Sequence, residues 1–262
     1  MPELPDLQVF SGNLKKLFLG KAITFAAAHN AAKLNVLTQD FTSAIVGAHI
    51  SDIVRMGKEL FFHFSNGNVA SIHLMLNGVF TATTAGKADS IAHKIISLTF
   101  ADDTALCVSD YQGLAKVTLN PSLTKTPDAL SPQFDGAYFT AAAKRYARMN
   151  VKSFLIDQKI VKGIGNAYAD EILWKADISP ECTVGRIPPA ALQELYDAIG
   201  IMLRDAIENI LRLSPDRISG EERSFLRVHN PRRKTSEDGE PILVKDIANK
   251  RTYYTAKQRL FF

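Results

Sequence analysis

The hydrophobic pattern of this sequence changes its period near the middle of the chain, and that change limits the folds open to it. From about Ile23 to Leu119, runs rich in β-branched and aromatic residues, such as ELFFHF and KIISLTF, alternate with Asn, Asp and Gly turns. Such runs predict short β-strands. From Gly136 to about Leu213, apolar residues recur at helical spacing instead. Between them, NPSLTKTPDALSPQFDG contains three prolines and has no period, which predicts a linker.

Both ends of the chain add an element to this pattern. After PELP, Leu7, Phe10, Leu14 and Phe18 lie at helical spacing, and Gly20 ends that helix. Near the C-terminus, LRVH and RTYYTAK flank a polar, turn-prone centre. We therefore predict an α+β multidomain fold: an N-terminal helix with a β-sandwich, then a helical domain, then a terminal β-hairpin. The expected domains are 1–120, a linker over 121–135, 136–224 and 225–262.

Composition indicates a globular chain with a mild preference for polyanions. At 262 residues, with 46% hydrophobic and 22% charged residues, the chain can bury a core in each of two domains. Its 31 Lys+Arg against 27 Asp+Glu give a net charge of +4. Positive charge concentrates in Lys144–Lys152 and Arg223–Arg259, which suits a nucleic-acid partner, although either patch alone could be an ordinary solvated face.

Several classes of protein are disfavoured by what the sequence lacks. It shows no charged leader with an apolar run and no long apolar stretch, so we expect a soluble cytoplasmic protein, nucleoid-associated if bacterial. Cys107 and Cys182 are too few for a four-cysteine zinc site, and the six histidines lack metal-ligand spacing. We therefore predict no metal and no other cofactor. The absence of a Gly-x-Ser-x-Gly elbow and of a phosphate loop argues against a general hydrolase.

The N-terminal MPELP supports two interpretations. Pro2 and Pro5 suit the first turn of a helix, where a missing N–H has no partner to lose. Alternatively, removal of Met1 gives Pro2 a free secondary amine, which can attack an aldehyde. From the terminus alone, the helix start is favoured.

The stretch KIVKGIGNAYADEILWKADISP is the most specific in the sequence. Gly163 and Gly165 permit a sharp turn between two helices, the second starting near Asn166. The N–H groups at such a helix start, flanked by Lys159 and Lys162, form a natural phosphate site. A plain helical hairpin with a glycine turn is the alternative on geometry alone.

Three stretches together carry a family resemblance. PELP, LSPQFDGAYF and GIGNAYADEILWKADISP, in this order, resemble the formamidopyrimidine-DNA glycosylase and endonuclease VIII family. The resemblance covers nearly the whole chain. It implies a β-sandwich carrying an N-terminal proline, a helix–two-turn–helix domain and a finger hairpin. It also implies a monomer that acts on damaged double-stranded DNA as a bifunctional glycosylase and abasic-site lyase in base excision repair.

The resemblance assigns the chemistry to the N-terminus. Pro2 would attack the sugar C1′, expel the base through an imine and permit strand cleavage by elimination. An α-amine titrates at about 7.7–8.0 in model peptides, against about 10.4 for lysine, so more of it is unprotonated at neutral pH. Glu3 would serve as general acid/base, and Lys58 would point at the DNA near the lesion. Asp6 stands in the lesion pocket where family members commonly carry glutamate.

Further residues are assigned to DNA binding by the same resemblance. Lys152 would approach the damaged nucleotide, and Gly165 with Asn166 would bind phosphate. Arg251 would clamp a phosphate from the finger, although an ungapped alignment places Lys250 there instead. The damaged nucleotide must leave the base stack, because its C1′ is inaccessible within it.

The chain departs from the family pattern in three places. The four zinc cysteines of the finger are replaced, so we expect a zincless finger; the replacing residues are Thr235, Asp238, Thr255 and Gln258. The wedge that fills the space left by the flipped base becomes Leu76, Gln112 and Leu114, without the arginine that probes the orphaned base. The segment LSPDRISGEERSF is too short for the loop that caps 8-oxoguanine in many relatives.

These departures keep a second hypothesis open. We expect poor activity on 8-oxoguanine, with ring-opened purines, hydantoins, oxidised pyrimidines and abasic sites as better substrates. The alternative is a non-catalytic or lyase-only relative that binds damaged DNA without turning it over.

Overall fold

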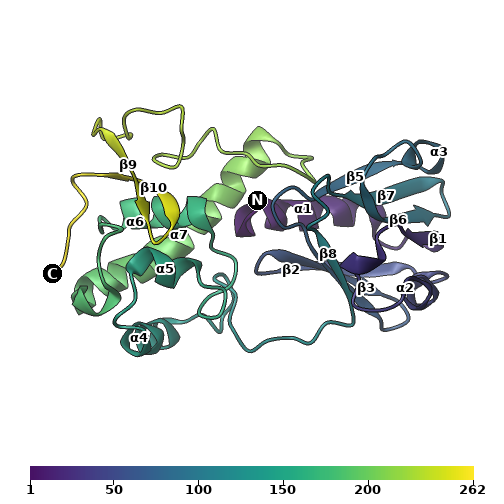
Figure 1. The fold of residues 1–262 in the computed structure, drawn as a ribbon, viewed down its shortest axis with the longest axis horizontal. Coiled ribbons are helices and arrows are strands. Elements are labelled where there is room, and N and C mark those ends of the chain that lie inside the picture. The colour runs from purple at the N-terminus through teal and green to yellow at the C-terminus, as the bar shows by residue number, and fades with distance from the viewer. The chain divides into compact units, whose positions relative to one another are not determined.

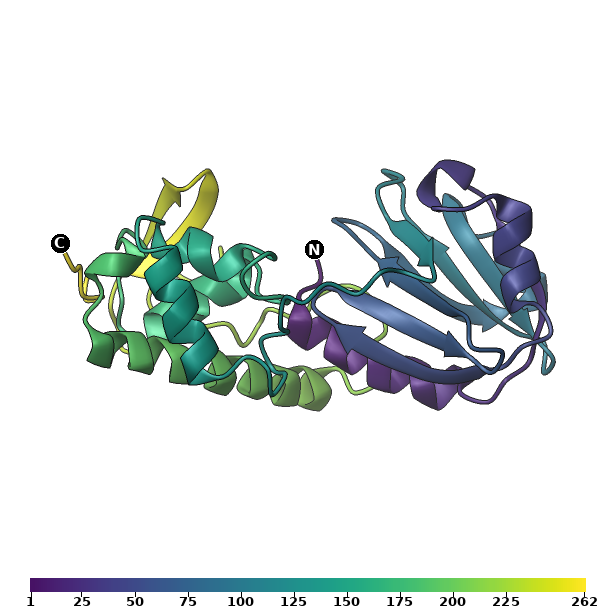
Figure 2. The same ribbon diagram turned by 90° about the horizontal axis from the view of Figure 1, so that it is seen from below.

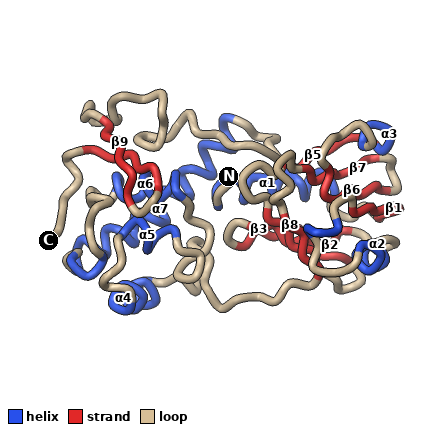
Figure 3. Tube along the Cα trace, viewed as in Figure 1, coloured by secondary structure: helices blue, strands red, loops and turns tan.

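The chain forms two compact units in the computed structural model, which describes residues 1–262. Unit 1 comprises Met1–Thr124 and Ile210–Glu221, and unit 2 comprises Lys125–Asn209 and Glu222–Phe262. Unit 1 holds two β-sheets, whereas unit 2 is helical apart from one strand pair (Figure 3). The predicted α+β architecture is confirmed.

The contacts divide the chain differently from the predicted domain limits in two details. Residues 210–221 group with unit 1, although the sequence pattern placed them in the helical domain. In the predicted linker, Ala129 and Phe134 are buried, so part of this segment packs within unit 2. The segment nevertheless forms no helix or strand, as its prolines lead one to expect. The domain limits themselves stay a prediction.

Helix α1 (Leu4–Phe18) opens unit 1 and begins where the prolines predict. Glu3 is its N-cap residue and forms a capping box with Asp6, which satisfies backbone donors that have no partner within a helix. Its apolar face, spaced at three and four residues, is fully buried along the strands (Figure 2). Gly20, with φ +77°, ends the helical segment in a conformation that favours glycine.

The strands of unit 1 form two four-stranded antiparallel sheets, ordered β1-β6-β7-β5 and β2-β3-β4-β8. Phe62 in one sheet and Phe80 in the other meet with ring centroids 6.0 Å apart, so the two sheets pack as the predicted sandwich. The strands are β1 (Ile23–Ala28), β2 (Ile50–Met56), β3 (Glu59–Phe64), β4 (Val69–His73), β5 (Val79–Thr84), β6 (Lys94–Phe100), β7 (Thr104–Ser109) and β8 (Lys116–Leu119).

Three short helical segments interrupt the strand order of unit 1 and were not predicted. They are η1 (Ala31–Lys33), α2 (Thr38–Ile45) and α3 (Ala85–Ala88). Helix α2 buries only Phe41 and Ile45, one turn apart, which is too short a pattern to separate from the surrounding strand texture.

Unit 2 contains the predicted helices and the terminal hairpin (Figure 1). An aromatic cluster supports its core, with Phe139 5.6 Å from Phe154 and 5.6 Å from Tyr196 between ring centroids. The elements are α4 (Gly136–Arg145), α5 (Val151–Ile156), α6 (Asn166–Lys175), η2 (Val184–Arg186), α7 (Pro189–Leu213), β9 (Ile242–Ile247) and β10 (Lys250–Thr255), the end of α7 belonging to unit 1. None of the helices combines the length and the apolar character needed to cross a lipid bilayer.

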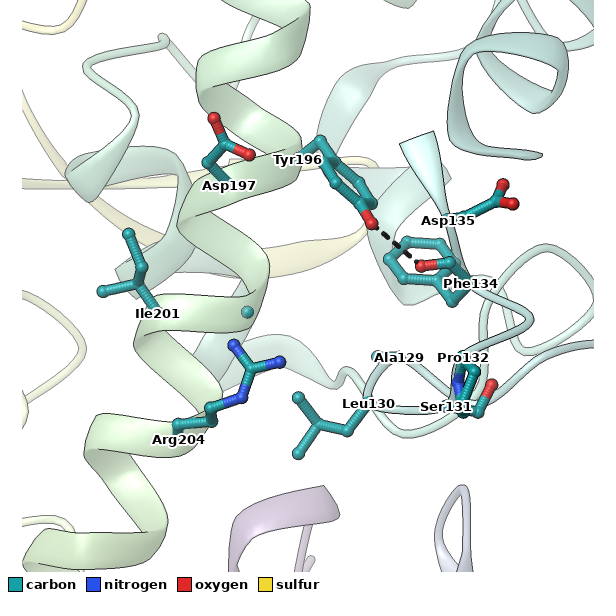
Figure 4. A pocket seen from close by; sticks show the side chains of 11 residues that line it. Ala129, Leu130, Ser131, Pro132, Phe134, Asp135, Tyr196, Asp197, Ile201 and Arg204 are labelled. Atoms are coloured by element: carbon teal, nitrogen blue, oxygen red, sulfur yellow. Dashed lines mark hydrogen bonds between the residues drawn. The ribbon is translucent and has the colours of Figure 1, made fainter. Parts of the chain in front are cut away.

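A pocket of about 650 Å³ lies in unit 2 between α7 and the proline-rich segment (Figure 4). The Tyr196 hydroxyl donates a hydrogen bond to the Phe134 carbonyl across one side of it, at 3.1 Å. Ile201 and Arg204 line it from α7. The pocket contains none of the residues predicted to bind DNA or to catalyse.

Candidate active site and nucleic-acid interface

The N-terminus of unit 1 borders a pocket of about 630 Å³. Pro2 lines this pocket together with Leu76 and Tyr111, which come from the loops after β4 and β7. The Met1 amine pairs with the Glu221 carboxylate. While Met1 is present, the Pro2 nitrogen is part of a peptide bond, so its use as a nucleophile requires removal of Met1.

Glu3 and Asp6 stand beside Pro2 at the start of α1. Glu3 is buried, with 4% of its surface exposed, and follows Pro2, which lines the pocket, in the sequence. Asp6 has no exposed surface, does not line the pocket, and accepts a hydrogen bond from the Glu3 N–H through Oδ2 at 2.9 Å. Its short side chain therefore caps the helix in this structure, and its assignment to the lesion pocket stays a prediction.

Lys58 lies at the tight turn between β2 and β3, after Gly57 with φ +60°. Only 9% of its surface is exposed. Burial lowers the pKa of His73 nearby, Glu59 opposes that shift, and the charge of Lys58 adds to it. His73 also accepts the Met75 N–H at Nδ1, at 2.9 Å, a role that only the unprotonated nitrogen can fill.

The structure brings the loops of the predicted wedge residues together. Asn77, next to Leu76, donates to Gln112 Oε1 at 2.6 Å. Asp110, buried below Gln112, accepts the backbone N–H groups of Gln112, Leu114 and Ala115 at 2.8–2.9 Å. Leu76 remains 54% exposed, and Leu114 is half-buried. A buried carboxylate with three backbone donors holds this loop in one conformation.

In unit 2, the turn between α5 and α6 has the predicted helix–two-turn–helix form. The Gln158 side chain donates to the carbonyls of Ile156 and Ile164 at 2.8 Å and accepts the Gly163 N–H at 2.9 Å. Gly163 requires glycine, with φ +105°. Gly165 is the N-cap of α6 in an extended conformation, so its role is to place the helix start, where backbone N–H groups favour an anion.

Asn166 and Arg251 are joined across unit 2. The Asn166 amide donates to the Arg251 carbonyl at 2.9 Å, while its Oδ1 is buried without a hydrogen-bond partner. The Arg251 guanidinium lies 5.8 Å from the centroid of the Tyr253 ring. Lys250 and Arg251 are both exposed at the start of β10, so the two alternatives for the phosphate clamp lie side by side.

The structure differs from the prediction for Lys152. Its side chain has no exposed surface, and its Nζ lies 2.7 Å from Asp170 Oδ1 and 2.6 Å from Thr252 Oγ1. A lysine is buried in this way only when its charge is paired. In this structure Lys152 therefore belongs to an internal ion network, and its approach to the damaged nucleotide stays a prediction.

The four positions that replace the family's cysteines form no common cluster of ligands. Thr255 and Gln258 are buried, and Gln258 accepts the Thr255 N–H and donates to the Ile178 carbonyl, both at 2.8 Å. Thr235 and Asp238 are exposed. No group of three or more His, Cys, Asp or Glu side chains is arranged to hold a metal ion. Hydrogen bonds therefore hold the base of the hairpin together.

Comparison with known sequences decides the family. Residues 1–117 match the formamidopyrimidine-DNA glycosylase N-terminal domain, and residues 126–214 match the H2TH domain of the same glycosylase. The chain belongs to the formamidopyrimidine-DNA glycosylase family. It is thus a DNA-binding DNA glycosylase of base excision repair, as the sequence resemblance implied.

Individual relatives agree with this family. The chain is 33% identical to the formamidopyrimidine-DNA glycosylase of Enterococcus faecalis over 219 residues, covering 79% of this chain and 77% of the relative. It is 31% identical to that of Carboxydothermus hydrogenoformans over 211 residues, covering 79% and 78%.

Solved structures share the fold of this glycosylase. The Lactococcus lactis Fpg, in complex with DNA containing an abasic site, superposes with a TM-score of 0.84 at 23% identity, covering 97% of this chain and 98% of that one. MutM, in complex with DNA containing carbocyclic 8-oxo-G, gives the same TM-score, identity and coverage.

Sequence reasoning missed three residues that the structure places at the two sites. Tyr111, 66% exposed, lines the Pro2 pocket beside the wedge. Asp170 and Glu171 are buried acids on α6. An exposed aromatic in a polar loop and two adjacent acids within GIGNAYADE are the signals that could have found them.

Proposed function

We propose that this glycosylase is bifunctional and works through an imine at Pro2. The observation that carries the proposal is that Pro2, near the chain terminus, lines the unit 1 pocket and is followed in sequence by the buried Glu3. Once Met1 is removed, the Pro2 amine attacks C1′ of the damaged nucleotide. The bond from C1′ to the base nitrogen breaks, its electron pair leaves with the base, and the Pro2 nitrogen gives up its proton. The C1′–O4′ bond then opens, its electron pair goes to O4′, which takes up a proton, and an iminium forms between Pro2 and C1′.

Strand cleavage then follows by elimination. The iminium acidifies the C2′ proton; loss of that proton expels the 3′ phosphate, and water releases the sugar from Pro2. Glu3 protonates the ring oxygen in the first stage and carries protons in the second. Lys58, which adds positive charge beside His73, contacts the phosphate near the lesion.

The nucleic-acid interface includes the start of α6 and the finger hairpin. Asn166, the N-terminus of α6 and Arg251 are close to one another in unit 2, linked by the amide-to-carbonyl hydrogen bond. Together they supply phosphate ligands of the kind that position a protein on DNA without reading its sequence. Lys250 adds a further positive charge at the same edge.

The short segment that follows α7 limits which damaged bases the enzyme can accept. Ser219 holds it to β5, because its hydroxyl donates to the Phe80 carbonyl and accepts the Phe80 N–H, each at 2.6 Å. Asn13 also donates to the carbonyls of Pro215 and Arg217 at 2.7 and 2.9 Å. A segment held in this way is poorly suited to closing over 8-oxoguanine.

Excision rates on a panel of duplexes test this proposal. We expect the Met1-processed protein to release a ring-opened guanine or a hydantoin, and to nick an abasic site, at least about tenfold faster than it releases 8-oxoguanine, since each 1.4 kcal/mol of lost contacts is a factor of ten in rate. Single-turnover rates of base release and strand cleavage are measured on otherwise identical duplexes. Release of 8-oxoguanine at an equal or higher rate contradicts the lesion choice.

The alternative function is binding of damaged DNA with no glycosylase turnover, or with lyase activity alone. Gln112, in the position of the base-probing arginine, is the observation that favours it. Tight binding to every lesion duplex without base release, by protein shown to lack Met1, supports this alternative and contradicts the glycosylase proposal.

A further inference from the structure

Asp170 is the centre of a buried network that joins the finger hairpin to the helices of unit 2. Its Oδ1 lies 2.7 Å from Lys152 Nζ, and its Oδ2 lies 2.7 Å from His229 Nδ1. Oδ2 also accepts the Tyr253 N–H at 3.0 Å. Neither the Asp170 nor the Lys152 side chain is exposed. We call these residues, with Thr252, the Asp170 network.

The network fixes three consecutive residues of β10. The Arg251 carbonyl accepts hydrogen bonds from Lys152 Nζ at 3.3 Å and from Asn166 Nδ2 at 2.9 Å. Thr252 Oγ1 lies 2.6 Å from Lys152 Nζ, and the Tyr253 N–H donates to Asp170. Figure 1 shows β10 beside α6. Charge-assisted hydrogen bonds of this kind are the strongest available to a backbone segment.

The same network also supports the side chain of Arg251, through a chain of ring contacts. The Arg251 guanidinium lies 5.8 Å from the centre of the Tyr253 ring. That ring meets the His229 ring edge to face, with centroids 4.7 Å apart. His229 is in turn held by Asp170 through Nδ1. The backbone and the aromatic support of Arg251 therefore both depend on one buried carboxylate.

We propose that Asp170 is a positioning residue for the DNA contact of Arg251. It is itself only 1% exposed, so it acts through β10 and the Tyr253 ring and does not touch the DNA. It also pairs with the buried charge of Lys152, with Nζ 2.7 Å from Oδ1. The inference rests on the proposed function, in which Arg251 is a phosphate ligand.

The salt dependence of binding separates positioning from a loss of folded protein. Each phosphate contact contributes about 0.9 to the slope of log affinity against log salt concentration. Misfolding lowers the amount of active protein but leaves that slope unchanged. The affinity of the full chain is measured for a duplex that contains a tetrahydrofuran abasic-site analogue. The KCl concentration is varied from about 50 to about 300 mM, over which the release of counterions changes the affinity.

Three variants and one control are compared. We expect Arg251→Ala to lower the slope by about 0.9 and the affinity about tenfold. Asp170→Asn should lower the slope by a similar amount, and Asp170→Asn/Arg251→Ala should match Arg251→Ala alone. Asp197→Asn makes the same chemical change at an exposed position on α7, where Oδ1 accepts a hydrogen bond from Gln193 Nε2 at 3.0 Å. This control should retain the wild-type slope.

The outcomes distinguish a failure of the proposed DNA role of Arg251 from a failure of the positioning role of Asp170. A wild-type slope for Arg251→Ala contradicts the proposed DNA role of Arg251. A changed slope for Arg251→Ala with a wild-type slope for Asp170→Asn overturns the positioning role, as does a further loss of slope in the double variant. If Asp170→Asn does not fold, Lys152→Met/Asp170→Asn removes both buried charges together; a reduced slope in that variant supports the proposal, and a wild-type slope overturns it.

Discussion

Replacing Glu3 by glutamine is expected to slow base release by about 10²–10⁴-fold, because the proposed reaction loses its general acid/base. Glutamine has nearly the same size and keeps an oxygen for the helix N-terminus, so α1 should still form. DNA affinity should remain close to that of the wild type. Single-turnover base release and lesion-duplex binding, measured on the same preparation, separate these two effects.

Asp6→Asn is the matched control for this change. Asp6 accepts the Glu3 N–H, and asparagine retains an oxygen acceptor at that position. Removing its charge should therefore alter base release far less than Glu3→Gln does. Equal losses in the two variants would indicate that the negative charge at the helix start matters and that Glu3 has no individual role in proton transfer.

Replacing Glu171 by alanine is expected to be among the most destabilising single changes in unit 2. Its carboxylate accepts the backbone N–H groups of Arg227, Val228 and His229 at 2.7–2.9 Å. Burial raises the pKa of Glu171, and these three donors act in the opposite sense. Alanine leaves the donors buried without partners, at about 1–3 kcal/mol each, a large part of the 5–15 kcal/mol that typically stabilises a domain.

Thermal unfolding measures this effect. The melting temperature should fall on the order of 10 °C or more for a unit of this size. Glu208→Ala, at an exposed position on α7, deletes the same side chain without removing any buried hydrogen bond and should change the melting temperature little. A similar small change in Glu171→Ala would mean that the backbone at Arg227 to His229 finds other partners.

The fold could be predicted well where the hydrophobic period is long and regular. The eight strands of unit 1 follow alternating or continuous apolar runs, and α7 follows a 25-residue helical pattern. Helix α2 could not be predicted, because two buried residues one turn apart carry no period. Residues 210–221 could not be assigned to unit 1, because their contacts are with residues about two hundred positions away, as Asn13 shows.

The site could be predicted where the sequence carries a local motif, and not where partners meet only in three dimensions. Pro2 and Glu3 are adjacent in sequence, and Pro2 lines the unit 1 pocket while Glu3 is buried. The family resemblance placed Lys152 near the damaged nucleotide, whereas its partner Thr252, 100 residues away in the chain, could not be found from the sequence. The burial of such a lysine depends on tertiary pairing, which no local pattern reports.

The finger hairpin shows the same limit. The loss of the cysteines is visible in the sequence, but what replaces metal ligation is not. Gln258 bonds to Thr255 within the hairpin and to Ile178 outside it, and Asp170 binds the N–H of Tyr253. The contacts of Gln258 with Ile178 and of Asp170 with Tyr253 join residues 80 and 83 positions apart in the chain, so no local pattern reports them.

Trapping of the covalent intermediate tests the central claim most directly. Protein verified to lack Met1 is incubated with a duplex containing one abasic site, and borohydride is added to reduce any imine. An imine at Pro2 should give a covalent protein–DNA adduct that disappears when Met1 is retained and that maps to Pro2 by mass spectrometry. An adduct of equal yield with Met1 retained would move the nucleophile to a lysine and contradict the account.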